Sequence, residues 1–316
     1  MITGRRQSLD AYRGVALIAM AAYHAIWDLA YYGVVEAGIG IDPVWVTIQR
    51  SILTAFLLLA GAGLVMAHGD RFDARRFIRR EALLIGATAV VSLVTWFQFG
   101  PALAYFGTLH LIALGSLLAL PLITAPLWVT GAIAAIVLLA PALYSSDAFD
   151  PPLLNWIGFF RTTPETADLV PIFPWFGVML VGIVGMRLLK DTPVFTWHSD
   201  RIPLQMLARL GRISLVFYLV HQPLLFAIIT PLASAIHDGE RNKLVSFTQS
   251  CEASCLAGPG KSEGAGAEQF CTAYCHCALD MTVRGDLWDA LSARLRTPEQ
   301  QRQIDQVQGL CTAMSE

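Results

Sequence analysis

The chain has 316 residues, of which 55% are hydrophobic and 15% are charged, with a formal net charge of -2 and a mean hydropathy of +0.54. A soluble domain has about 25% charged residues, so this composition excludes an ordinary soluble enzyme and indicates a membrane protein. So small a net charge does not indicate any particular partner. We expect the lipid bilayer as a partner from the composition, and no nucleic acid.

Long apolar runs dominate the first 235 residues. The stretch from Ala82 to Ser146 contains no Asp, Glu, Lys or Arg. A helix needs about 20 apolar residues to cross a bilayer, so this stretch alone is long enough for three crossings. A transmembrane barrel would need alternating polar and apolar residues, whereas these runs are continuously apolar. The sequence therefore predicts an all-α, polytopic bundle of transmembrane helices.

About seven spans are expected in chain order. They cover roughly residues 10–34, 45–68, 81–99, 103–121, 125–143, 169–188 and 211–235. The apolar segment 153–160 is too short to cross, and we interpret it as an interfacial or re-entrant piece. Residues 1–235 form the predicted membrane domain, and residues 236–316 form a separate, polar, cysteine-rich tail that we expect to be helical.

Arginines predict the orientation in the membrane. They gather before the first span and in the loops at 69–80 and 187–212, whereas the opposite loops are acidic. The positive-inside rule then places the N-terminus in the cytoplasm, and seven spans place the tail outside. We expect the inner membrane of a bacterium, with the tail in the periplasm.

All cysteines lie in that tail, at Cys251, Cys255, Cys271, Cys275, Cys277 and Cys311. An even set in an exported segment is typical of disulfide bonds. Cysteines four residues apart share a helix face, so two helices could be joined by two disulfides, with Cys277 and Cys311 forming a third. A zinc site that uses His276 is the alternative; we favour disulfides because the tail is predicted to be external, and we expect no metal.

Ionisable residues lie inside the first predicted span. Eleven residues at about 100° each bring a helix back to within about 20°, so Arg13 and His24 share a face, about 16 Å apart along the axis. Asp28 lies on the same face and could orient the imidazole, and Asp10 could pair with Arg13. Ionisable residues in a membrane are usually functional, although Arg13 could simply anchor the helix end.

Further polar residues are predicted in the middle and outer half of the bundle. Arg50 on the second span could form an ion pair with Asp28, and His110 and His221 lie on the fourth and seventh spans. Imidazole can act as a base or as a nucleophile in acyl transfer. The alternative is a structural role, in which these groups clamp or hydrogen-bond neighbouring helices.

Two histidine motifs resemble known families. The spacing of Arg13 and His24 resembles the first-span signature of the membrane-bound acyltransferase-3 family, and LGRISLVFYLVHQPLLF at 210–226 resembles a pattern near the end of its core. SLDAYRGVALI, GTLHLIALG and PIFPWFGVMLVG resemble bacterial relatives of the catalytic domain of heparan-α-glucosaminide N-acetyltransferase. The resemblance covers about residues 8–230 and leaves the tail out, and the predicted spans are fewer than such proteins typically have.

The resemblance implies a membrane acyltransferase. It would move an acyl group, expected to be acetyl from acetyl-CoA, from the cytoplasm to a hydroxyl or amine of a glycan or glycolipid at the outer face. His24, Asp28 and His221 would be catalytic. Arg13, Arg50 and His110 would bind the donor or the acceptor, with Arg13 holding the charged end of acyl-CoA and His24 meeting the thioester.

Two other functions stay open. One is a small-molecule or lipid transporter or flippase that uses the polar stripe as a pathway; against it, we find no inverted internal repeat. The other is a non-catalytic membrane scaffold that presents the tail.

Overall fold

The computed structural model describes the chain except for residues 1–5, 36, 40–41, 70–71, 165, 237–238, 258–264, 293–295 and 316. Two compact units make up the chain, Met1–Asp28 with Ala37–Ala227 and Leu29–Glu36 with Ile228–Glu316. Throughout the described part the secondary structure is helical, apart from one isolated bridge between Phe106 and Leu169. The predicted all-α fold is confirmed.

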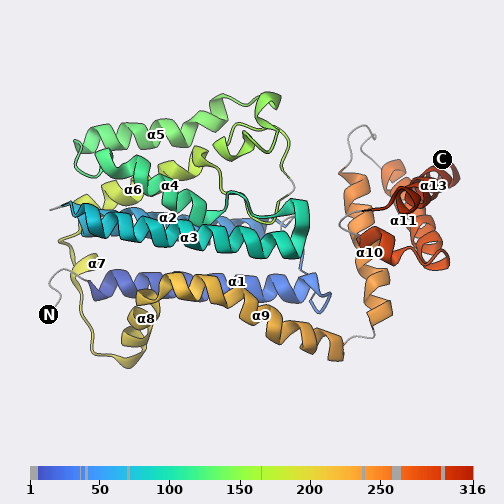
Figure 1. Cartoon of the computed structure of the whole chain (residues 1–316), viewed down its shortest axis with the longest axis horizontal. Coiled ribbons are helices and arrows are strands. Elements are labelled where there is room, and N and C mark those ends of the chain that lie inside the picture. Colours follow the sequence, from blue (N-terminus) through green and yellow to red (C-terminus); the bar gives the residue numbers. More distant parts are fainter. Residues whose placement is uncertain are drawn as a thin grey trace. The chain divides into compact units, whose positions relative to one another are not determined.

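The apolar helices lie in the first unit, except for the C-terminal ends of two of them, and they run side by side in Figure 1. Helices long and apolar enough to cross a membrane are α1 (Gln7–Tyr31), α2 (Pro43–His68), α3 (Ala74–Phe99, continued by η1, Gly100–Ala102), α6 (Ile172–Leu189) and α9 (Ser214–Ile236). Shorter apolar helices are α4 (Thr108–Ala119, continued by η2, Leu120–Leu122) and α5 (Leu127–Leu143). Each predicted span coincides with one of these helices, and the number that cross the bilayer stays a prediction.

Residues that cap helices fix where the two longest spans begin. Asp42 accepts a hydrogen bond from the Val44 backbone N–H at 2.7 Å, and Pro43 follows as the first residue of α2. Asp73 accepts from the Arg76 backbone N–H at 3.0 Å at the start of α3, and this bond lowers the pKa of Asp73. Side chains of this type satisfy amide groups that the first helical turn leaves unpaired.

Helix α6 lies at the centre of the packed core. It packs against α2 on one side and α5 on another. A Cβ atom at Gly61 would collide with the Met179 carbonyl oxygen, and one at Gly182 would collide with that of Leu58. Small residues therefore allow the α2 and α6 backbones to approach closely, as is common between membrane helices.

The segment between α6 and α9 is more ordered than the sequence suggested. The sequence predicts an arginine-rich loop here, but the segment contains α7 (Pro193–Thr196) and α8 (Ile202–Arg212). Helix α8 packs closely on α1 at two glycines. A Cβ at Gly14 would collide with the Leu207 carbonyl oxygen, and a Cβ at Gly211 would collide with the Asp10 carbonyl oxygen. The apolar segment 153–160 forms only a short 3-10 turn, η4 (Asn155–Ile157), and a second turn, η3 (Asp147–Phe149), precedes it.

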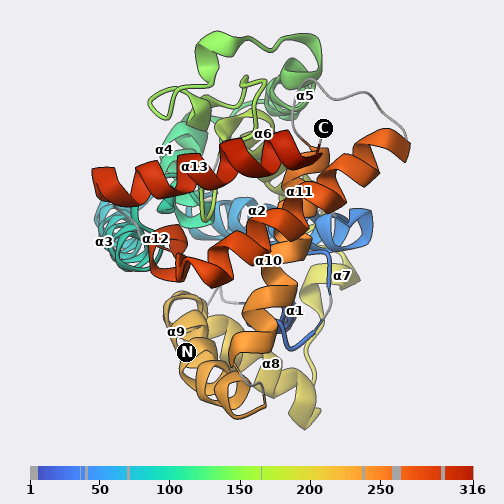
Figure 2. The same ribbon diagram turned by 90° about the vertical axis from the view of Figure 1, so that its right-hand side faces the viewer.

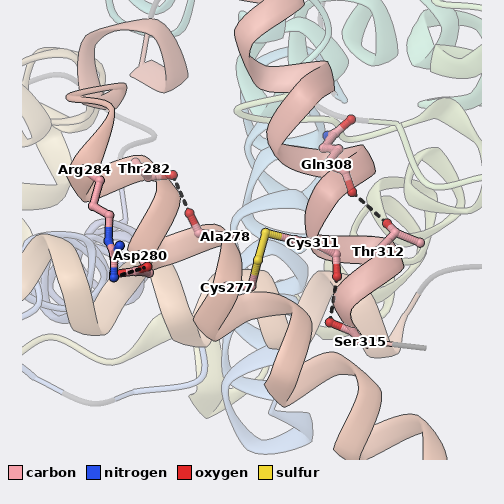
Figure 3. Close-up of a disulfide and its surroundings, with 9 residues drawn as sticks. All are labelled: Cys277, Ala278, Asp280, Thr282, Arg284, Gln308, Cys311, Thr312 and Ser315. Carbon is pink, nitrogen blue, oxygen red and sulfur yellow. Dashed lines mark hydrogen bonds and ion pairs between the residues drawn. A yellow bond between two sulfur atoms is a disulfide. The ribbon is translucent and has the colours of Figure 1, made fainter.

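The second unit contains helices α10 (Gly239–Leu256), α11 (Ala265–Arg284), α12 (Trp288–Ser292) and α13 (Pro298–Ser315), visible in Figure 2; the cysteines lie on α10, α11 and α13. Helix α11 packs against both α10 and α13. All six cysteines are paired, as Cys251–Cys275, Cys255–Cys271 and Cys277–Cys311. The third bond joins α11 to α13 (Figure 3). The predicted disulfides are confirmed, and the zinc alternative is wrong in this structure.

Candidate active site

Two predicted catalytic histidines come together from opposite ends of the first unit's sequence. The ring of His24 on α1 lies 5.1 Å, centroid to centroid, from the ring of His221 on α9. His221 is buried and stacks on Phe217, with ring centroids 6.0 Å apart. The two motifs that suggested a function thus supply one pair of imidazoles.

The hydrogen bond of His221 identifies its tautomer. Its Nδ1 atom lies 2.7 Å from the carbonyl oxygen of Tyr218, which can only accept. Nδ1 therefore carries the proton in the neutral ring, and Nε2 presents a lone pair. Among the described residues this buried Nε2 has no hydrogen-bond partner. A nitrogen held in this way is suited to take a proton from a bound group.

The third predicted catalytic residue, Asp28, lies one helical turn after His24. It is fully buried, and its Oδ1 accepts a hydrogen bond from Gln222 Nε2 at 2.7 Å. Its Oδ2, like Gln222 Oε1, finds no partner within the described part of the chain. Buried polar atoms are normally hydrogen-bonded. The site therefore presents acceptors that a hydrogen-bond donor from outside the chain could satisfy.

The expected ion pair between Asp28 and Arg50 is not formed in the described structure. Gln222 provides the hydrogen bond to Asp28 instead, and the Arg50 side chain is exposed on α2. The physical reason is the rotation of α9 about its axis, which places the side-chain amide of Gln222 against the Asp28 carboxylate. The neutral Gln222 amide thus takes the place of the Arg50 cation that the sequence predicts beside Asp28.

Arg13 occupies a separate cluster near the start of α1. Its Nη1 lies 3.5 Å from Oδ1 of Asp10, as predicted, and Arg212 Nε lies 3.5 Å from Oδ2 of the same buried carboxylate. Its Nη2 lies beside Gly63 on α2, where a Cβ would collide with it. Among the described residues, two guanidinium groups therefore lie on the one carboxylate of Asp10, and such groups recognise anionic ligands.

His110 is bonded at both ring nitrogens. Its Nδ1 accepts from the Gly107 backbone N–H at 3.2 Å, so Nε2 carries the proton and donates to Ser92 Oγ at 3.2 Å. Ser92 in turn donates to the Ala104 carbonyl oxygen. These contacts give His110 a structural part at the start of α4, and its predicted part in binding stays a prediction.

Sequence reasoning assigned no role to three further residues near the histidines. Gln222 and Tyr218 belong to the same sequence motif as His221, and this proximity in the sequence could have indicated a role for them. Asp168 precedes α6 and had no sequence signal. Its Oδ2 accepts from the Thr108 backbone N–H at 3.1 Å, and burial raises the pKa of Asp168 to about 6. The Tyr218 phenol interacts with both Asp168 and the Thr108 side chain.

Metal ligands do not gather at this site. Within the described ranges, no group of three His, Cys, Asp or Glu side chains is placed to hold a metal ion. The polar groups that do meet are the two imidazoles, one carboxylate and one amide.

A bundle of apolar helices in which a buried histidine, His221, lies beside a partly exposed one, His24, defines a polytopic membrane protein with a polar site between its helices. Residues 5–223 match the family described as heparan-alpha-glucosaminide N-acetyltransferase, catalytic. The chain belongs to this family, which confirms the resemblance and makes it a membrane acyltransferase by family. Comparison with curated proteins and with solved structures found no significant match. The family match ends before the cysteine-rich tail.

Proposed function

We propose that the protein transfers an acetyl group from cytoplasmic acetyl-CoA to a hydroxyl or amine of a glycan or glycolipid at the outer face of the membrane. The family supports acetyl transfer within a membrane. One observation of the site supports it further: a buried imidazole Nε2 with a free lone pair lies beside a second imidazole and a buried carboxylate.

The pair supplies the proton transfers that acyl transfer needs. His221 Nε2 accepts the proton as the acceptor oxygen or nitrogen attacks the thioester carbonyl carbon. The carbon–sulfur bond then breaks, and the CoA sulfur leaves and gains a proton. In a second route the nucleophile is His24, which carries the acetyl group and then passes it on. Both routes use the same two rings.

Asp28 and Gln222 support this chemistry by position. The carboxylate lies one turn from His24 and is held by the Gln222 amide. Its remaining oxygen can accept from the attacking hydroxyl or amine and can stabilise an imidazolium ring. We assign Asp28 to the catalytic group with His24 and His221.

The donor is proposed to bind with its phosphates toward the cluster of Asp10, Arg13 and Arg212. Guanidinium groups recognise phosphate by paired hydrogen bonds, and two of them lie on the Asp10 carboxylate in the described structure. The pantetheine arm would extend along α1 toward His24. Arg50 and His110 stay proposed binding residues, without a contact to the histidine pair that supports a sharper role.

This direction of transfer depends on the proposed location in the inner membrane of a bacterium. Arginine-rich segments favour a cytoplasmic N-terminus and inner loops at 69–80 and 187–212. The disulfides of the tail favour an oxidising compartment such as the periplasm.

Labelled acetyl-CoA tests the proposal. The purified full chain in lipid nanodiscs should retain acetyl-CoA, and membranes that contain it should transfer the label to a glycan or lipid fraction. His24→Ala and His221→Ala should abolish transfer but not retention. His198→Ala removes an exposed histidine before α8 and should change neither.

Two results would contradict this function. If the purified protein retains no acetyl-CoA, this result would favour the transporter or the scaffold hypothesis over the acetyltransferase. Transfer at the normal rate by the His24→Ala and His221→Ala variants would remove the histidine pair from the reaction.

A further inference from the structure

A cleft of about 630 Å³ lies within the cysteine-rich module. Its floor is formed by α11, through Tyr274 and Ala278. One wall is α10, represented by Phe247, and the opposite wall includes Ile304 and Val307 of α13. Ligand-binding sites commonly have volumes of about 300–1,000 Å³ and mostly apolar linings, so this cleft has the size and character of such a site.

Disulfides attach both walls of the cleft to its floor. Cys251–Cys275 and Cys255–Cys271 join α10 to α11, and Cys277–Cys311 joins α11 to α13. Each wall is therefore bonded covalently to the floor. The module can keep an apolar cleft between α10 and α13 without packing the two helices tightly together, which hydrophobic burial would otherwise favour.

Polarity changes from the floor of the cleft to its mouth. Ala278 and Ile304 are buried, whereas Ser254, Gln308 and Arg296 are exposed at the edge. The Arg296 guanidinium at this edge donates to the backbone carbonyls of Ala290 and Leu291 and to Gln301 Oε1. An apolar floor with a polar, cationic edge fits an amphipathic molecule with one apolar chain and a polar head.

The same compact unit contains the ends of two apolar helices. Leu29–Glu36 follows the core of α1, and the unit resumes at Ile228 on α9. Tyr32 and Thr230 hydrogen-bond at 2.7 Å and join these ends, and α10 begins three residues after α9 ends. The module is therefore attached directly to segments of membrane-helix character, where lipid is the most abundant amphipathic molecule.

We propose that this cleft binds the acyl chain of a membrane lipid, with the lipid head group at the edge lined by Ser254 and Arg296. This binding site lies outside the family match and does not depend on the acetyltransferase proposal. It gives the cysteine-rich module a function in lipid recognition.

Photocrosslinking tests the site in the full chain. The protein is reconstituted in phosphatidylethanolamine and phosphatidylglycerol vesicles that contain a trace of phosphatidylethanolamine with a diazirine in its acyl chain. Irradiation should attach the lipid to peptides that carry Phe247 and Tyr274. Ala278→Trp fills the floor and should remove this labelling, while labelling of the exposed apolar residues of α3 stays constant. Ala273→Trp, on an exposed face of α11, should leave both unchanged.

A second substitution guards against a folding defect. Ser254 is exposed, so Ser254→Trp should block the mouth without disturbing the helices, and mass measurement without reduction should find all disulfides intact. The variant should lose labelling in the same peptides. Spans labelled without any labelling of the tail would overturn the proposal, as would tail labelling that neither Ala278→Trp nor Ser254→Trp reduces.

Discussion

Individual side chains of the candidate active site are fixed by partners that leave one reactive atom available. His221 is held by its own helix through Tyr218, and Asp28 is held across helices by Gln222. His221 is bonded at Nδ1 and Asp28 at Oδ1, whereas His221 Nε2 and Asp28 Oδ2 have no hydrogen-bond partner within the described structure. Such fixed orientation reduces the entropy that a reaction would otherwise cost, because the groups need not be ordered when substrate binds.

Arg13 gives the first prediction at this scale. Arg13→Ala should weaken acetyl-CoA binding by about 1–3 kcal/mol, because a charge-assisted hydrogen bond is lost. Arg13→Lys should restore only part of the affinity, since an ammonium lacks the forked geometry. Titration of the nanodisc protein measures the effect, with Arg284→Ala in the tail as a control. Equal affinity in all variants would leave Arg13 as a structural anchor.

Asp168 gives a prediction for pH. Its pKa is raised from 3.8 to about 6, so the folded protein holds a proton that the unfolded chain releases, and stability falls as pH rises through this window. Asp168→Asn keeps the acceptor for Thr108 but cannot ionise. It should therefore be more stable than the parent at neutral pH, by on the order of 1 kcal/mol, and equal to it at low pH. Thermal unfolding in detergent at both pH values measures this difference.

Asp150 provides a control with the opposite sign. Backbone N–H groups of Arg161 and Thr162 donate to its carboxylate and lower the pKa of Asp150. A lowered pKa stabilises the fold at neutral pH, and this stabilisation is lost on acidification. Asp150→Asn should therefore reduce stability at neutral pH. A gain in stability from Asp150→Asn, or none from Asp168→Asn, would contradict the argument.

Helix pairs show why particular glycines are needed. Gly182 and Gly185 lie on the same helix, α6, but only a Cβ at Gly182 would collide with the α2 backbone. We predict that Gly182→Ala destabilises the bundle by about 1–3 kcal/mol through forced separation of α2 and α6. Gly185→Ala should be neutral or slightly stabilising, since its Cβ would meet no described atom within 4 Å and alanine favours helix. Thermal unfolding of both variants compares them, and equal effects would refute the packing argument.

Helices were easier to predict than their contacts. Apolar length and charge-free runs located every span helix, and two motifs located the histidines. The partner of Asp28 was missed because it depends on the rotation of α9, which hydrophobicity does not fix. Helix α8 was missed because its charges made it resemble a loop, whereas its position depends on close contact of Gly211 with α1. The position of Asp168 depends on how a loop folds back onto α4.

The whole chain combines a family-matched membrane unit with a disulfide-bonded tail. The match ends at residue 223, and all six cysteines follow it. Disulfides form and persist mainly in oxidising surroundings, so the redox state of the tail in cells tests the proposed orientation. The proposed boundary at residues 235 and 236 separates an apolar segment from a polar segment that contains the three disulfides.

Because disulfide bonding of the tail depends on its compartment, the orientation of the protein in the membrane can be tested in intact cells. A membrane-impermeant thiol reagent should label no cysteine of the parent until a reductant is added, and should then label the tail. Unreduced mass measurement should find six hydrogens fewer than the thiol form, as three disulfides require. Two added cysteines give an independent result: Asp147→Cys, in a predicted outer loop, should react in intact cells, whereas Asp191→Cys, in a predicted inner loop, should react only after lysis. The reverse pattern, or free thiols in the parent, would place the tail in the cytoplasm and reverse the proposed direction of acetyl transfer.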